Sequence, residues 1–453
     1  MLAYLYLWRK DRKIMKTILS VIAILFASTL YAQTSTSQNC ELPRRAIKPY
    51  ASVDEALLSS DSPSRYITPL TEWKRAESDG NVIFTTTYVY PAAWLNRQLL
   101  LRVESASSGY IVAVNGSEVG STTNGTNPAE FNVTKKSQQG INELQITIPS
   151  NNPTAALLAS AAPALGKVAI LSQPTIRVRD IDNTTRLNDS GDAITEFNIV
   201  VKTDALNPKS SRIHYELLAP DTTRIAYGYK DITLEMRGED TVSFAAVVPA
   251  KWLWSIHNPN LMRLVVRNQV EGRYAENIAV PIGLREVKYN DKKLSVNGKS
   301  AALRVAMASN DITAIEIAAL KLQGYNALMV QAGIAADALY ARCDSVGIYV
   351  VPQMAIDTSH GAGNIKRNGN PSNNPMWKEF YLARAGEMYH SAKSHPSVVA
   401  FSLGGGTTNG INLYESYLML KGLEPIRPII FLGAGGEWNN DQIDGSTMPT
   451  IKK

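Results

Sequence analysis

The chain has 453 residues, with 46 lysines and arginines against 40 acidic residues, for a formal net charge of +6. This small excess is spread along the sequence without a basic block or a basic patch interleaved with aromatics, which argues against nucleic acid as a partner. Cys40 and Cys343 are the only cysteines, too few for a disulfide framework or a cysteine metal site. We expect no metal site and no cofactor.

The N-terminus has the three-part pattern of a secretory signal peptide. Met15 and Lys16 open a short basic segment, residues 18–30 are apolar, and Ala32 ends a cleavage motif before Gln33. We therefore predict a signal peptide at residues 1–32, with Met15 as an alternative start, and a linker at 33–44. An uncleaved N-terminal anchor is the alternative.

No later segment reaches the roughly 18 consecutive apolar residues that a membrane helix needs. We expect no membrane span after signal cleavage. The predicted location is secreted or periplasmic, with outer-membrane association as a further option.

From about residue 45 to 285 the sequence is typical of β-structure. Short alternating runs, such as 83–90, 98–103 and 143–148, are separated by turn signals. The pair Asn115-Gly116 predicts a hairpin turn. A break near residues 163–174 ends one set of strands before another begins. The pattern predicts two β units, at 45–172 and 173–284.

From about residue 300 the sequence pattern changes, and apolar runs alternate with longer amphipathic segments. This alternation predicts βα units and a parallel sheet. The expected strands are 302–307, 325–330, 347–352, 397–403 and 427–431, and the expected helices are 314–322, 337–346 and 375–394.

One segment of this last region carries a recognisable motif. Residues 395–410 read His-Pro-Ser-Val-Val-Ala-Phe-Ser-Leu-Gly-Gly-Gly-Thr-Thr-Asn-Gly. They resemble H-P-S-[IV]-[IV]-x-W-S-x-G-N-E, an active-site strand of glycoside hydrolase family 2, the family of β-galactosidases, β-glucuronidases and β-mannosidases. The resemblance implies that the final Glu is the general acid/base and that the Asn before it binds the sugar. In this chain those two positions are Gly406 and Gly405.

The resemblance extends over nearly the whole chain after the predicted signal peptide. Residues 88–144 are similar in order to the jelly-roll, galactose-binding-like domain of that family, and residues 248–287 are similar to its immunoglobulin-like domain and the entry to its barrel. It implies a multidomain β plus α/β protein: a jelly-roll sugar-binding domain at 45–172, an immunoglobulin-like β-sandwich at 173–284, and an incomplete (β/α)8 TIM barrel at 285–453. Trp254 is interpreted as a packing residue.

Active sites of such barrels lie at the carboxyl ends of the strands, where this chain departs from the family pattern. The position of the arginine that steers the nucleophilic carboxylate is Met329, and a usually acidic position is Gln353. The family nucleophile is a second Glu after the seventh strand, whereas the sequence given ends at Lys453 after about six strands. A retaining glycosidase needs two carboxyl groups about 5–5.5 Å apart. We therefore assign no catalytic residue.

Polar and aromatic residues expected near the rim are candidates for substrate binding. They are Asn326, His360, Trp438 and Asp441. Trp438 is the strongest candidate for stacking on a sugar face. The competing interpretation is packing for the aromatic residues and a solvated loop charge for Asp441.

Two functions from different classes remain open. In the first, the chain is a secreted, catalytically inactive homologue that binds carbohydrate or is a structural component of an extracytoplasmic assembly. In the second, it is a β-glycosidase, β-galactosidase-like, with a displaced or externally supplied acid/base. An open parallel sheet leaves an unpaired edge, so we expect closure by irregular packing, a protein partner or a second copy of the chain.

Overall fold

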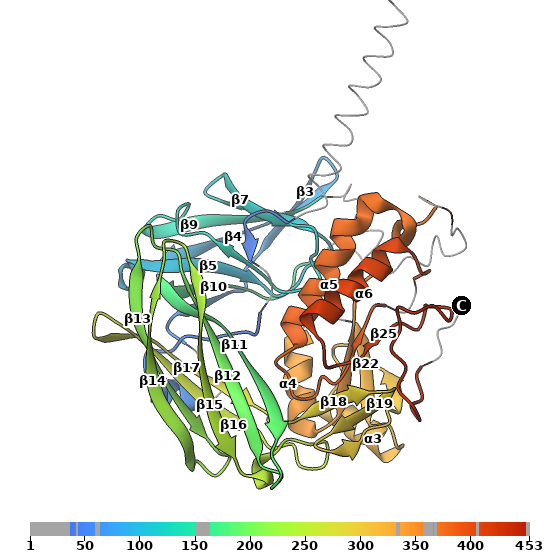
Figure 1. Ribbon diagram of the computed structural model, residues 1–453. Helices are drawn as coiled ribbons and strands as arrows, with labels where there is room; N and C mark the ends of the chain where they lie inside the picture. Colours follow the sequence, from blue (N-terminus) through green and yellow to red (C-terminus); the bar gives the residue numbers. More distant parts are fainter. Residues whose placement is uncertain are drawn as a thin grey trace, which may run out of the picture.

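The computed structural model describes residues 37–41, 44–58, 64–149, 164–331, 336–356, 366, 369–404 and 407–449. The predicted signal peptide, His360, Gly405 and Gly406 lie outside these ranges. Two β-sandwiches and an α/β unit follow one another along the chain and pack together (Figure 1). Among the helices of the described ranges, none is long and apolar enough to cross a bilayer.

The first sandwich consists of two five-stranded antiparallel sheets. One sheet has the order β1 (Cys40–Glu41), β8 (Ala129–Asn132), β5 (Arg97–Val103), β10 (Val168–Pro174) and β2 (Ile67–Leu70). The other sheet has the order β3 (Lys74–Ser78), β4 (Asn81–Tyr90), β9 (Gly140–Ile148), β6 (Tyr110–Val114) and β7 (Ser117–Thr122). Strand β4 shows why they pack: Val82, Phe84, Tyr88 and Tyr90 alternate inward into the shared core. The short element η1 (Ala92–Trp94) lies between β4 and β5, and α2 (Val53–Leu58) contacts β17 (Arg273–Ile282) of the second sandwich.

The hairpin predicted at Asn115-Gly116 is confirmed. The two residues join β6 to β7, whose strands pair from Val114 and Ser117 outward. Asn115 has φ 49° and Gly116 φ 72°. Positive φ at both central residues is the requirement of a type I′ turn, which explains why this dipeptide was informative in the sequence.

The second sandwich packs a three-stranded sheet on a four-stranded one. The three-stranded sheet has the order β11 (Ile176–Leu187), β12 (Ala193–Thr203) and β15 (Glu239–Val248). The four-stranded sheet has the order β14 (Arg224–Leu234), β13 (Lys209–Leu218), β16 (Met262–Val270) and β17 (Arg273–Ile282), and η3 (Ala250–Trp252) follows β15. The rings of Phe197 and Phe244 stack at 4.8 Å across β12 and β15, and Tyr215 of the opposite sheet stacks on Phe244 at 3.7 Å. These aromatic stacks join the two layers.

The α/β unit begins with an antiparallel sheet and continues as a five-stranded parallel sheet. The antiparallel strands are β18 (Val287–Asn290), β19 (Lys293–Val296) and β20 (Lys299–Ser300). The parallel strands lie side by side in sequence order: β21 (Val305–Met307), β22 (Ala327–Gln331), β23 (Tyr349–Gln353), β24 (Phe401–Ser402) and β25 (Ile429–Ile430). The helices are α3 (Ala314–Leu322), α4 (Ala336–Val346), α5 (Lys378–Ala392) and α6 (Ile411–Leu423), with the turns η5 (Pro371–Asn373) and η6 (Pro375–Trp377) before α5. The predicted fold class, β-sandwiches with a partial TIM barrel, is confirmed.

Alternation within the parallel strands separates two apolar cores. In β22, Leu328 and Val330 pack under the helices, whereas Ala327 and Met329 point into the barrel interior. All four side chains are fully buried. Both faces of the sheet are therefore covered, as parallel sheets require.

The edges of the parallel sheet are covered by the chain itself. At one edge, the Asp441 amide donates to the Ile429 carbonyl at 2.8 Å, beside β25. At the other edge, Val305 of β21 donates to the Thr447 carbonyl at 3.0 Å, and Thr447 donates to the Leu303 carbonyl at 2.7 Å. One irregular segment, residues 441–447, thus reaches both edge strands. A protein partner is not needed to satisfy these main-chain groups.

Two contacts dock the sandwiches onto the α/β unit. Trp254, which lies between η3 and β16 of the second sandwich, is fully buried in the barrel interior, and its Nε1 donates to the Asp344 carbonyl at 2.8 Å. Its interpretation as a packing residue is confirmed. From the first sandwich, Asn124 and Asn127 donate to the Glu387 carboxylate of α5 at 2.6 and 2.9 Å. The three units therefore share buried polar and apolar contacts.

Candidate functional site

The carboxyl ends of the parallel strands, where a barrel holds its active site, are poor in ionisable groups. The last residues of the five strands are Met307, Gln331, Gln353, Ser402 and Ile430. None of them is acidic or basic. This edge of the sheet offers amide, hydroxyl and thioether groups, which can bind a ligand but cannot exchange a proton near neutral pH.

Two acids in the described loops beyond these ends, Asp311 and Glu437, lie at the surface. Asp311, in the loop after β21, is exposed and accepts a hydrogen bond from the Ser309 hydroxyl. Glu437, in the loop after β25, is exposed as well. A general acid is usually tuned by burial or by a neighbouring charge, and solvent-exposed loop positions provide little of either.

The family resemblance predicts an arginine where this chain has Met329, and the surroundings of Met329 are apolar. The side chain is fully buried among Val351, Ala400 and Ile430 in the barrel interior. The Gln353 amide donates to the Met329 sulfur at 3.6 Å. A thioether here replaces the fixed positive charge that would keep a nearby carboxylate ionised.

The segment that carries the family's acid/base positions is described up to Gly404 and again from Thr407. Ser402 and Leu403 are fully buried, and Gly404 has φ 126°, a conformation that favours glycine. The strand therefore turns sharply directly before Gly405 and Gly406. Those two positions themselves lie outside the described residues.

Two of the predicted binding residues lie away from the carboxyl ends. Asn326 precedes β22, at its amino end; its Oδ1 accepts from the Arg304 amide at 2.7 Å, and its Nδ2 donates to the Ala302 carbonyl at 2.8 Å. Asp441 lies beside the start of β25, and its carboxylate accepts from the Tyr417 hydroxyl at 2.8 Å and from the Ile429 amide at 2.8 Å. Both side chains form hydrogen bonds with main-chain groups of the protein itself. His360 lies outside the described residues.

Trp438 differs from these residues because it faces solvent within an aromatic group. Its side chain is 56% exposed. Tyr414 stacks on it with ring centroids 5.1 Å apart and an interplanar angle of 21°, and Tyr417 meets it edge-on at 5.7 Å. The two tyrosines stand on α6, whose first turn follows the carboxyl end of β24. A flat, half-exposed aromatic surface of this kind suits the apolar face of a sugar ring.

The loop that carries Trp438 is anchored by an amide pair. Asn409 and Asn439 exchange hydrogen bonds of 3.0 Å in both directions, and Asn439 is fully buried. Trp438 was predicted from the sequence, whereas Tyr414 and Tyr417 were not, because no helix was predicted at the residues that form α6. Their spacing of three residues would be informative once a helix is assigned there, since such residues share one helix face.

Comparison with known proteins agrees with this architecture. The TIM barrel domain of glycosyl hydrolases family 2 matches residues 288–449, and a second model of the same family matches residues 176–285. Together these matches span more than half of the chain. The chain belongs to glycosyl hydrolase family 2, as a divergent member.

Individual relatives are distant. The chain is 25% identical over 380 residues to a β-galactosidase of Psychromonas ingrahamii, covering 78% of this chain and 36% of the relative. It is 26% identical over 377 residues to a β-galactosidase of Vibrio vulnificus, covering 78% and 35%. The chain thus spans about a third of the length of the curated relatives it matches.

Solved structures show the same fold. β-Glucuronidase 2 of Bacteroides uniformis superposes with a TM-score of 0.67 at 17% identity, covering 87% of this chain and 52% of that one. A family 2 β-galacturonidase of Eisenbergiella tayi superposes with a TM-score of 0.65 at 16% identity, covering 87% and 71%. At these identities the likeness concerns the fold alone.

Proposed function

We propose that this chain is a non-catalytic member of glycosyl hydrolase family 2 that binds carbohydrate, or is a structural component of an assembly, outside the cytoplasm. The observation that carries the proposal is the pair Gly405-Gly406 at the positions of the family's sugar-binding Asn and acid/base Glu. Glycine has no proton to transfer, and a positioned general acid/base contributes about 10²–10⁴-fold to the rate.

The buried thioether of Met329 supports the same conclusion independently. A carboxylate nucleophile works in its ionised form and benefits from a nearby cation. Met329 is enclosed by apolar residues and faces the neutral amide of Gln353. Restoring the acid alone, as Gly406→Glu, should therefore leave hydrolysis undetectable.

Carbohydrate is the ligand class that the exposed aromatic group and the relatives favour. Trp438, with Tyr414 and Tyr417, offers a stacking surface beside the carboxyl end of β24. The named relatives act on β-galactosides, β-glucuronides or β-galacturonides, judging from their names. Glycans that contain galactose or a uronic acid are accordingly the first ligands to test.

The experiment combines a hydrolysis assay with a binding assay on the same preparation. A panel of nitrophenyl β-glycosides should show no turnover above the buffer blank, and a glycan array should show binding to a subset of sugars. Hydrolysis at enzyme-like rates, retained through repeated chromatography, would contradict the proposal and favour the alternative of a β-glycosidase with a displaced acid/base.

The proposal of an extracytoplasmic location depends on the N-terminal sequence pattern. Expression of the full-length chain in a bacterial host, followed by fractionation and N-terminal sequencing, should give a product that starts at Gln33 in the periplasm or medium. A product that keeps residues 15–32 in the membrane fraction would indicate an uncleaved anchor. Light scattering of the same product tests the proposed homo-oligomer, and co-purification from an envelope extract tests a protein partner.

A further inference from the structure

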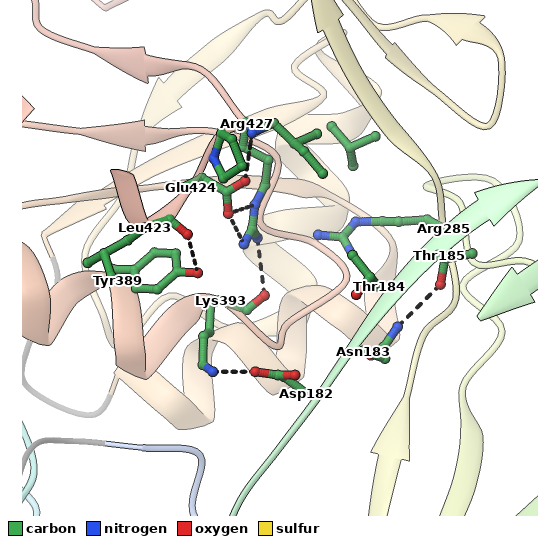
Figure 2. A pocket seen from close by; sticks show the side chains of 13 residues that line it. Asp182, Asn183, Thr184, Thr185, Arg285, Tyr389, Lys393, Leu423, Glu424 and Arg427 are labelled. Carbon is green, nitrogen blue, oxygen red and sulfur yellow. Dashed lines mark hydrogen bonds and ion pairs between the residues drawn. The ribbon is translucent and has the colours of Figure 1, made fainter. Parts of the chain in front are cut away.

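A pocket of about 240 Å³ lies between the second sandwich and the helical layer of the α/β unit. Figure 2 shows its walls: residues 182–185 of β11 on one side, Tyr389 and Lys393 from the end of α5 and residues 423–427 on the other, with Arg285 reaching in from the linker. The volume equals roughly eight water molecules at about 30 Å³ each. Because residues 423–427 precede β25, the pocket lies toward the amino ends of the strands, away from the family's active-site edge.

The ionisable groups of the pocket carry an excess of positive charge. Three cations, Arg285, Lys393 and Arg427, face two carboxylates. Lys393 pairs with Asp182 and, at 3.1 Å, with Asp180, which itself also pairs with Arg44. Arg427 donates from Nε to the Glu424 carboxylate at 2.8 Å. Each carboxylate of the pocket is therefore already matched by one cation.

Arg285 is the unmatched cation. Within the described ranges, no carboxylate lies at ion-pair distance from it. Its Nη2 donates to the Val398 carbonyl at 2.6 Å and to the His395 carbonyl at 3.2 Å, and its Nε is buried without a partner. Arg427 Nη1 donates to the same Val398 carbonyl at 3.3 Å. Two guanidinium groups thus converge on one oxygen.

The surroundings of Arg285 disfavour its charged form. Burial, and then the neighbouring charge of Arg427, lower the pKa of Arg285 to about 9, and the more distant carboxylates of Asp344 and Glu424 offset this only in part. A bound anion would offset the desolvation penalty of a partly buried guanidinium that has no carboxylate at ion-pair distance. Guanidinium groups also match carboxylate, sulfate and phosphate geometrically, because their donors form a planar fork.

We infer that this pocket binds an oxyanion group, seated on Arg285, at the junction of the second sandwich and the α/β unit. The ligand class is a carboxylate, sulfate or phosphate, either as a free ion or as the acidic group of a small sugar. The second source fits the volume and the hydroxyl and amide groups of Asn183, Thr184 and Thr185 on the opposite wall. This site is separate from the surface at Trp438 and does not depend on carbohydrate binding there.

The test is isothermal titration calorimetry of the full-length mature chain with sulfate, phosphate, glucuronate and glucose, at constant ionic strength set with chloride. We expect saturable binding of at least one oxyanion, weakened tenfold or more in Arg285→Met. The matched control is Arg97→Met. Arg97 also donates to two main-chain carbonyls at 3.0 Å each, that of Ser172 in its own sandwich and that of Ala275 in the second sandwich, but it does not line the pocket. Its loss should leave the affinity unchanged.

The four titrants distinguish the source of the oxyanion. Binding of sulfate or phosphate assigns the site to a free ion, and binding of glucuronate alone assigns it to an acidic sugar. Equal affinity for glucose and glucuronate, equal affinity of Arg285→Met and the unaltered chain, or no saturable heat with any oxyanion would each overturn the inference.

A second variant covers the case in which Arg285→Met does not fold. Glu424→Gln removes one negative charge from the wall while it keeps the side chain's shape and its acceptor for the Arg427 amide, a bond of 3.0 Å. The affinity for the oxyanion should then rise severalfold. An unchanged or lower affinity in this variant would contradict an anion site.

Discussion

The strongest electrostatic prediction concerns His395, which is buried between two carboxylates of α4. The side chain is 4% exposed; its Nδ1 lies 2.7 Å from Asp344 Oδ2 and its Nε2 lies 3.4 Å from Asp337 Oδ1. Burial alone would lower the pKa of His395, but the charges and hydrogen bonds of Asp344 and Asp337 outweigh burial and raise it to about 9. We therefore expect His395 to carry a positive charge at neutral pH.

The pH dependence of stability follows from this shift. The pKa rises from an unfolded value of 6.5 to about 9, and one pKa unit corresponds to about 1.4 kcal/mol. A raised pKa stabilises the fold fully below the unfolded pKa and loses its effect as the pH rises through the folded pKa. The contribution is therefore about 3 kcal/mol at pH 6, and it disappears progressively toward pH 9.5.

Urea denaturation at pH 6, 8 and 9.5 checks this with two variants. The difference in the free energy of unfolding between the unaltered chain and His395→Gln should shrink by about 3 kcal/mol across this range. His390→Gln is the control. Burial and the charges of Arg44 and Lys393 lower the pKa of His390 to about 3, so only the unfolded state, with a pKa of 6.5, takes up a proton on this side chain near pH 6. Its difference should therefore rise by about 0.8 kcal/mol from pH 6 to pH 8 and then stay constant, opposite in direction to that of His395→Gln. A difference for His395→Gln that is flat or grows with pH would refute the reasoning.

Three further predictions follow from single contacts. Glu387→Ala leaves the fully buried Arg384 without its carboxylate partner at 2.5 Å and should lower the free energy of unfolding, measured by urea denaturation, by about 3–5 kcal/mol. Glu379→Ala, at an exposed site on the same helix, should change it by less than about 0.5 kcal/mol. Equal effects of the two substitutions would contradict a special role of the buried pair. Trp438→Ala should weaken any measured glycan binding severalfold with the thermal midpoint nearly unchanged, because the ring is 56% exposed; unaltered binding would remove it from the site. Trp254→Ala should lower the free energy of unfolding by about 3–5 kcal/mol because its buried ring fills the barrel interior, and a loss below about 1 kcal/mol would contradict its packing role.

Helices and strands whose hydrophobic residues follow a regular helical or alternating pattern were predicted well from the sequence. The helix expected at 314–322 is α3, and a capping box explains its start: Thr313 Oγ1 accepts from the Glu316 amide at 3.2 Å while Glu316 accepts from the Thr313 amide at 2.7 Å. The helix expected at 375–394 is α5 at Lys378–Ala392, because the prolines before it form 3₁₀ turns instead. The strand expected at 397–403 is regular only at Phe401–Ser402. Its earlier residues pair irregularly with β23.

The sequence by itself determined what residues 329, 405 and 406 can offer chemically. The family resemblance predicts an arginine, an asparagine and a glutamate at these places, and no tertiary contact gives the methionine and two glycines present a charge or a proton to transfer. The fold class depends likewise on alternation and on ordered motifs, which are local.

Only the tertiary structure decided which polar residues are already occupied. Asn326 and Asp441 were expected as ligand-binding candidates, but each bonds main-chain groups at the amino ends of the strands. Residues 441–447 form main-chain hydrogen bonds with both edges of the parallel sheet. The pocket at Arg285 combines residues from β11, the linker, the end of α5 and the segment before β25. The residues that line the pocket lie up to 245 positions apart in the sequence, from Asp182 to Arg427. Periodicity describes one element at a time, so pairings of this kind arise only when the elements pack.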